Sequence, residues 1–156
     1  MALIQRPYQL LSDLVVHEVD PSVGYARKVV NVSVAADSSF KLGTVFFRAK
    51  GTDPTVAYAP VVDATSLVTT NEFAVMIGDY YGYELAPVTV ALAESPKKLT
   101  VYKRGMVVLK DFTIKTAVQA TFPTISDAQF ATLCHLLENQ GVLVETAGTV
   151  VRPVLS

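Results

Sequence analysis

Most of the chain consists of short apolar runs, each ended within a few residues by glycine, proline or a polar turn. In RKVVNVSVA the expected apolar strand face is formed by Val30, Val32 and Val34, which follow the two-residue period of a β-strand. A second run, GTVFFRAK, stops at GTDP, where Pro54 cannot donate a ladder hydrogen bond. The pattern therefore predicts a mainly β (α+β) domain over residues 27–148, built as a small barrel or sandwich.

One segment has helical periodicity instead. In TISDAQFATLCHLLENQG, Ser126 is placed as an N-cap and Gln129 stands three residues later, which is the spacing of a capping box. The apolar residues that share one face at helical spacing are Phe130, Leu133, Cys134 and Leu137. Gly141 favours the left-handed backbone that ends a helix. The sequence thus predicts one helix, about 126–140, packed on the sheet.

The segment Ser95–Lys115 holds six of the thirteen basic residues of the chain. Two β-rich runs flank Lys103, Arg104 and Gly105, and a glycine at the third position of such a loop closes a bulged hairpin. We expect a hairpin whose tip exposes Lys103 and Arg104 to solvent. A specific phosphate or anion site is the alternative interpretation.

Charge and composition limit the partners of the chain. With 156 residues, half of them apolar, the chain is large enough for one core without a metal or a disulfide, and Cys134 is its single cysteine. The formal net charge of −1 argues against a nucleic-acid partner. No run of eighteen apolar residues is present, so we expect no membrane partner. The N-terminal residues do not follow the pattern of a secretory signal, and we expect them to be mature sequence.

Catalytic groups are sparse. Cys134 and His135 are adjacent in the expected helix, where neighbouring side chains point about 100° apart, so they cannot form a nucleophile and base pair. The only other histidine, His17, is far away in sequence, and no ligand spacing for zinc is present. We therefore expect no enzymatic activity, no cofactor and no metal.

The segment GDYYGYE is the most aromatic polar stretch. Its tyrosines, Tyr80, Tyr81 and Tyr83, lie between loop-forming glycines, and aromatic residues are enriched at protein interfaces. We expect a subunit interface here. The alternative is a ligand- or carbohydrate-binding module that uses these tyrosines to stack on a sugar, while acid–base catalysis by Asp79 and Glu84 is the least favoured interpretation.

The two ends of the chain are too apolar for disordered tails. Residues 1–26 are expected to form an arm that contacts a capsid or another subunit, and residues 149–156 a C-terminal extension. The candidate contact residues of the arm are Leu3, Ile4, Pro7, Tyr8, Leu10 and Leu11. An apolar arm of this kind can bind a partner as an added strand.

Taken together, the order of motifs resembles the lambda-type head decoration proteins of tailed bacteriophages. The family pattern is a strand, a short glycine turn into a second strand, an apolar stretch, a hairpin with Arg-Gly at its turn, and a late helix followed by glycine. The matching stretches are FKLGTVFFRA around Gly43, EFAVMIGD around Met76 and Ile77, LTVYKRGMVVL around Arg104 and Gly105, and FATLCHLLENQGVLVE around Gly141. The similarity spans roughly residues 29–145.

The resemblance implies a structural virion protein. Such a protein binds the outer surface of the expanded capsid, usually as a homotrimer, and cements neighbouring subunits of the major capsid protein. It would be made in the host cytoplasm and stabilise the head against the pressure of the packaged DNA.

Overall fold

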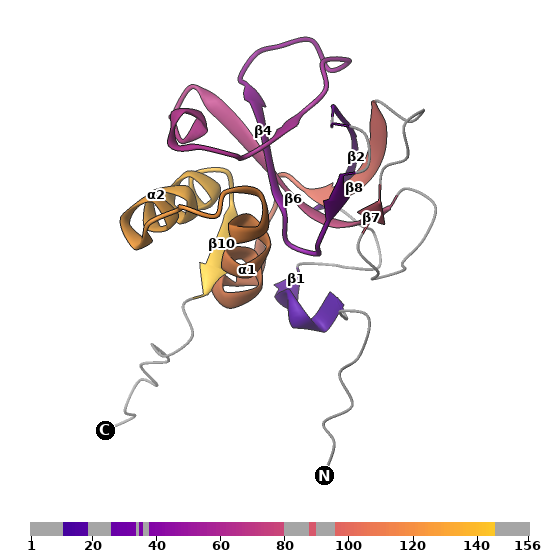
Figure 1. Ribbon diagram of the computed structural model, residues 1–156. Coiled ribbons are helices and arrows are strands. Elements are labelled where there is room, and N and C mark those ends of the chain that lie inside the picture. Colours follow the sequence, from indigo (N-terminus) through magenta and orange to yellow (C-terminus); the bar gives the residue numbers. More distant parts are fainter. Residues whose placement is uncertain are drawn as a thin grey trace, which may run out of the picture.

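A five-stranded antiparallel sheet forms the centre of the computed structural model (Figure 1). The structure describes residues 11–18, 26–33, 35, 38–79, 88–89 and 96–145. The strands follow the order β2 (Arg27–Val32), β8 (Lys97–Tyr102), β6 (Asn71–Asp79), β4 (Val45–Ala49) and β5 (Ala59–Pro60). Every neighbouring pair is antiparallel.

The two outer strands of this sheet meet through Tyr58. The Ser33 N–H donates to the Tyr58 carbonyl and the Tyr58 N–H donates to the Asn31 carbonyl, both at 2.8 Å. This parallel bridge, Val32 to Tyr58, closes one end of the sheet into a small barrel. The buried residues clustered inside are Val32, Phe40, Phe46, Tyr58, Ala74, Met76, Leu99 and Val101.

A second layer covers the outer face of the sheet. It contains α1 (Asp111–Thr121), α2 (Asp127–Glu138) and a three-stranded sheet in the order β1 (Val15–Glu18), β9 (Val107–Lys110) and β10 (Val142–Glu145). Figure 1 shows both helices and β10 on one side of β4 and β6. The strand β9 pairs antiparallel with β1 and parallel with β10. The main core lies between the two layers, because outward-facing residues of the barrel cluster with buried residues of the helices.

The remaining elements are short. The strands β3 (Ser39–Phe40) and β7 (Val88–Thr89) pair with each other. Two single-turn 3₁₀ helices complete the fold, η1 (Leu11–Asp13) and η2 (Ala64–Ser66).

The mainly β architecture and the late helix are confirmed. The Gln129 N–H donates to the Ser126 hydroxyl at 3.2 Å and the Ser126 N–H donates to Gln129 Oε1 at 2.8 Å, so the capping box is formed. Gly141 has a φ of 87° and directs the chain from α2 into β10. Local capping chemistry was therefore sufficient to predict this helix and its ends.

The hairpin expected around Gly105 is wrong, although its glycine turn is present. Gly105 has a φ of 103°, as the turn requires. The strands on either side belong to different sheets: β8 pairs with β2 and β6, whereas β9 pairs with β1 and β10. The turn therefore carries the chain from the barrel to the second layer.

A second helix, α1, lies where the sequence favoured no helix. It follows β9 without an intervening loop, and its turns contain the β-branched residues Thr113, Ile114, Thr116 and Val118. Its inner side is buried against the core, with Ile114 and Val118 fully inaccessible. Tertiary burial outweighs the modest helix propensity of these residues.

Two further predictions concern the turn at Gly43 and the N-terminal arm. Gly43 has a φ of 90°, and a β-carbon there would lie 3.3 Å from the Thr113 carbonyl oxygen, so the turn packs directly on α1. Within the expected arm, residues 11–18 are part of the folded domain, because Leu14 is completely buried and β1 pairs with β9.

Candidate functional site

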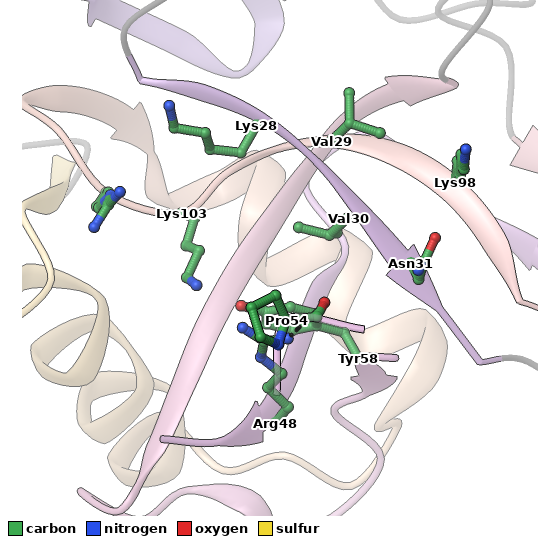
Figure 2. A pocket seen from close by; sticks show the side chains of 10 residues that line it. Lys28, Val29, Val30, Asn31, Arg48, Pro54, Tyr58, Lys98 and Lys103 are labelled. Atoms are coloured by element: carbon green, nitrogen blue, oxygen red, sulfur yellow. Dashed lines mark hydrogen bonds between the residues drawn. The ribbon is translucent and has the colours of Figure 1, made fainter. Parts of the chain in front are cut away.

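A basic hollow lies beside β2, at the edge where Tyr58 closes the barrel. Its volume is about 630 Å³. The basic residues that line it are Lys28, Arg48, Lys98, Lys103 and Arg104, and the other lining residues are Val29, Val30, Asn31, Pro54 and Tyr58. Figure 2 shows Lys28 and Lys103 towards one end of the hollow and Lys98 and Asn31 towards the other. The volume falls within the range of about 300–1,000 Å³ that is typical of ligand sites.

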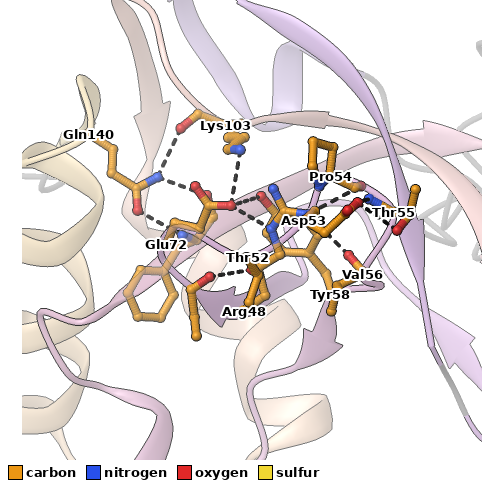
Figure 3. A network of polar contacts seen from close by, with 12 residues as sticks. Arg48, Thr52, Asp53, Pro54, Thr55, Val56, Tyr58, Glu72, Lys103 and Gln140 are labelled. Carbon is orange, nitrogen blue, oxygen red and sulfur yellow. Dashed lines mark hydrogen bonds and ion pairs between the residues drawn. The ribbon is translucent and has the colours of Figure 1, made fainter.

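Glu72 does not line this hollow, but it connects three residues that do (Figure 3). Its Oε1 atom accepts hydrogen bonds from Arg48 Nε at 2.5 Å and from the Tyr58 hydroxyl at 2.8 Å, and Lys103 Nζ lies 3.1 Å away. Arg48 also lies 4.6 Å above the centre of the Tyr58 ring. Three donors from β4, the segment before β5 and the turn after β8 thus converge on one carboxylate of β6.

Two groups of this network, Glu72 and Tyr58, have shifted pKa values. Burial acts to raise the pKa of Glu72, but the bonds from Arg48, Tyr58 and Lys103 outweigh it and lower the pKa below its ordinary value. Burial, aided by the bond to Glu72, raises the pKa of the Tyr58 hydroxyl. Neither group is poised to exchange a proton near neutral pH, so the network suits ligand binding better than acid–base chemistry.

Arg48 also holds the loop that borders the hollow. Its Nη1 atom donates to the carbonyls of Asp53 and Pro54 at 3.3 Å and of Val56 at 3.1 Å. The Asp53 carboxylate in turn accepts from the Thr55 N–H at 2.8 Å. The loop is therefore preorganised by one guanidinium group.

Gln140 joins the network to the second layer. The strand β8 ends opposite Val75 of β6. Phe73, two residues earlier in β6, therefore has no partner residue in β8. The Gln140 amide takes this place: it accepts from the Phe73 N–H at 2.7 Å and donates to the Phe73 carbonyl at 2.8 Å. It also donates to the Lys103 carbonyl at 2.9 Å, which fixes the start of the turn.

The predicted basic tip is only partly exposed to solvent. Arg104 is exposed, as expected. Lys103 is not, because its side chain is 22% exposed and forms an ion pair with Glu72. The sequence gave no signal for this pair, since 31 positions separate the two residues and only the sheet order brings them together.

A similar triad ties the two layers together. Tyr102 donates from its hydroxyl to Glu18 at 2.7 Å, and Arg27 Nη2 donates to the same carboxylate at 2.8 Å. Burial acts to raise the pKa of Glu18, but the bonds from Arg27 and Tyr102 prevail and lower it. This triad links β1 of the small sheet to β2 and β8 of the barrel.

Many of the predicted contact residues lie outside the described residues. These are Leu3, Ile4, Pro7, Tyr8, Leu10, Tyr80, Tyr81 and Tyr83, together with the extension 149–156. Leu11 is described: it is partly buried and packs against the main core. The interface and carbohydrate hypotheses for the tyrosine loop stay predictions.

The thiol and the imidazole singled out in the sequence are not brought together into a site. Cys134 packs at the border of the main core, and burial raises the pKa of its thiol to about 11. His135 points to solvent, with Nδ1 3.4 Å from the Glu138 carboxylate. Within residues 11–145 as described, no group of three metal-ligating side chains occurs, and no helix is long and apolar enough to cross a membrane.

No model of a known protein family, no curated protein and no solved structure matches the chain.

Proposed function

We propose that the protein is a capsid decoration protein of a tailed bacteriophage. In this proposal it binds the outer surface of the expanded head as a homotrimer and cements neighbouring major capsid subunits. The order of motifs in the sequence supports it. Of the elements that carry that resemblance, the Gly43 turn and the capped helix α2 are present, whereas the residues around Gly105 form a turn between two sheets and not the hairpin of the family pattern.

The position of β1 and β10 is the observation that carries the proposal. They are the two edge strands of one small sheet, with β9 between them. In the sequence, the apolar arm leads into η1 and β1, and the apolar segment TVVRPVLS follows β10. Both apolar segments are thus attached to the same sheet, where edge strands can accept strands from a partner.

Each edge strand of this small sheet also exposes one large apolar side chain, beside exposed polar residues. Val16 on β1 and Leu143 on β10 are large hydrophobic residues with exposed side chains. Exposed apolar side chains on two edge strands suit a protein contact. Because a trimer presents three such sheets, weak single contacts would combine into stable attachment to a repeating shell.

Co-sedimentation with expanded capsids tests the proposal. Full-length protein should bind at a fixed ratio to the major capsid protein and raise the temperature at which the capsid breaks. A variant lacking residues 1–10 should lose binding and keep its own melting temperature, because the deletion ends before η1 and leaves Leu14 in the core. Failure of the full-length protein to bind either expanded or unexpanded capsids would contradict the proposed function.

A further inference from the structure

The strand β10 forms an open edge of the small sheet. It pairs with β9 on one side, and no other described strand pairs with it. The Lys110 N–H donates to the Leu14 carbonyl at 2.7 Å, so the backbone groups of Lys110 face β1. Because the backbone groups of successive residues face opposite sides of a strand, those of Leu109 face β10.

The backbone of Val144 faces the open edge. Val144 lies opposite Leu109 in the parallel pairing. In a parallel pair, a residue bonds to the two neighbours of the residue opposite it, which here are Leu143 and Glu145. The N–H and the carbonyl of Val144 therefore point away from β9. Beyond the pairing with β9, no backbone hydrogen bond joins β10 to another described residue.

Apolar side chains lie on both faces of this edge. Leu143 is 42% exposed on the outer face, and Val144 packs against the main core on the inner face, where it is only partly buried. An open edge with apolar side chains favours association with other strands. A strand that covers it needs an apolar side chain on each face.

The residues that follow β10 have the pattern of such a strand. The stretch TAG ends in Gly148, which can adopt the positive φ of a tight turn, and TVVR at 149–152 is rich in β-branched residues. Val150 and Val151 are consecutive, so in any register one of them lies on each face of the sheet. Pro153 has no N–H and would end the pairing.

A glycine turn alone does not make a hairpin, as Gly105 shows, but the situation after β10 is different. The strands on either side of Gly105 have neighbours on both sides: β8 lies between β2 and β6, and β9 lies between β1 and β10. Among the described strands β10 has one neighbour only. A chain that reverses after β10 therefore meets an edge that is open to it.

We propose that residues 149–152 fold back on β10 as an antiparallel strand that closes this edge of the small sheet. The Val144 N–H would donate to this covering strand, and one of its two valines would cover Leu143. Of the two edges of the sheet, that of β1 would then remain for a partner strand. The inference is independent of the capsid assignment, because it concerns a contact within one chain.

Hydrogen exchange of the full chain, followed by NMR, tests the proposal. With the covering strand in place, the Val144 N–H should exchange at least about a hundredfold more slowly than in an unstructured peptide. V150P combined with V151P removes both possible donors of the covering strand and should accelerate this exchange at least about tenfold. V154P combined with L155P makes a matched change beyond Pro153 and should alter the exchange by less than about twofold.

Two further measurements accompany the exchange rates. The Glu145 N–H bonds to β9 in this arrangement, so its slow exchange in both double variants verifies that β10 is still paired. Light scattering should show larger assemblies for V150P with V151P than for the parent chain, because its edge is uncovered. The control double variant should match the parent chain.

Three results would overturn the proposal. Fast exchange of the Val144 N–H in the full chain would show that the edge is open. Equal exchange in the two double variants would show that residues 150 and 151 do not form the covering strand. In a mixture of isotope-labelled and unlabelled protein, contacts of Val144 with Val150 or Val151 of another molecule would assign the edge to a second copy. Each of these results leaves the capsid co-sedimentation test unaffected.

Discussion

At the residue scale, Glu72 is the group on which the hollow depends most. Its side chain is 18% exposed and neutralises two cations, Arg48 and Lys103. Removing the negative charge leaves both cations close together without compensation, and loss of one partner in such a network is costly. We expect Glu72→Gln to lower the free energy of unfolding by about 2 kcal/mol in urea titrations.

Asp127 provides the matched control. It is also a carboxylate bonded to a lysine, Lys115 at 2.7 Å, but its side chain is 92% exposed. Exposed pairs contribute little, so Asp127→Asn should destabilise the protein clearly less than Glu72→Gln does. Equal losses in the two variants would contradict the role assigned to the Glu72 network.

A second residue-scale prediction concerns acid. Glu18 and Glu72 have lowered pKa values in the folded protein, against an ordinary value of 4.5. A carboxyl group of this kind stabilises the fold fully above its unfolded pKa, and the stabilisation is lost as the pH falls through the folded pKa. The free energy of unfolding should therefore decrease as the pH is lowered below about 4.5.

Urea titrations at pH 7, 5, 4 and 3 provide the measurement. Glu72→Gln removes one of the two groups and should show a shallower decrease than the parent protein. A decrease of the same steepness in both proteins would show that Glu72 does not contribute to the acid sensitivity.

At the element scale, the contact between the Gly43 turn and α1 is a close backbone approach. Both Gly43 and Gly51 have positive φ, so alanine at either position incurs a strain of about 1–2 kcal/mol. At Gly43 the added β-carbon would also lie 3.3 Å from the Thr113 carbonyl, whereas at Gly51 it would meet nothing within 4 Å. Gly43→Ala should therefore be the more destabilising change.

Thermal and urea unfolding of the two alanine variants give the comparison. We expect the loss at Gly43 to exceed that at Gly51 by at least about 1 kcal/mol, because α1 or the turn must shift. Equal losses would mean that backbone strain alone explains the glycine at position 43.

The elements also show what the sequence could and could not predict. Ser126, Gln129 and Gly141 act through neighbours a few residues away, so local chemistry was enough to predict α2. The strands β8 and β9 each pair with strands far away in the sequence and not with each other. The hairpin prediction failed for that reason. The helix α1 was missed because its β-branched residues resemble a strand, and only its buried face stabilises it.

The same distinction applies to the hollow. Its basic residues were noticed where they cluster in sequence, at Lys103 and Arg104. Lys28, Arg48 and the balancing Glu72 come from three other segments, and only the strand order β2, β8, β6, β4 assembles them. The charge pattern along the chain cannot show that the Glu72 carboxylate pairs with Arg48 and Lys103 in the folded protein.

At the scale of the whole molecule, β6 couples the two layers. Ala74 and Met76 face the interior of the barrel, while Phe73 and Val75 face the helices, and all four are buried. Neither layer can lose its packing without exposing one face of β6. We therefore expect the described domain to unfold as one cooperative unit.

One substitution in each layer tests this coupling. Leu99 is fully buried inside the barrel and Leu133 is fully buried on the inner side of α2, so each change to alanine should cost about 2–5 kcal/mol. If the layers unfold together, each variant lowers the hydrogen-exchange protection of Val101 in the barrel and of Val118 in α1 by the same free energy. A loss confined to the substituted layer would show two separately unfolding units. In that case the Glu18 triad and β6 would not transmit stability between the small sheet and the barrel, and a partner bound at β1 and β10 would stabilise only its own layer.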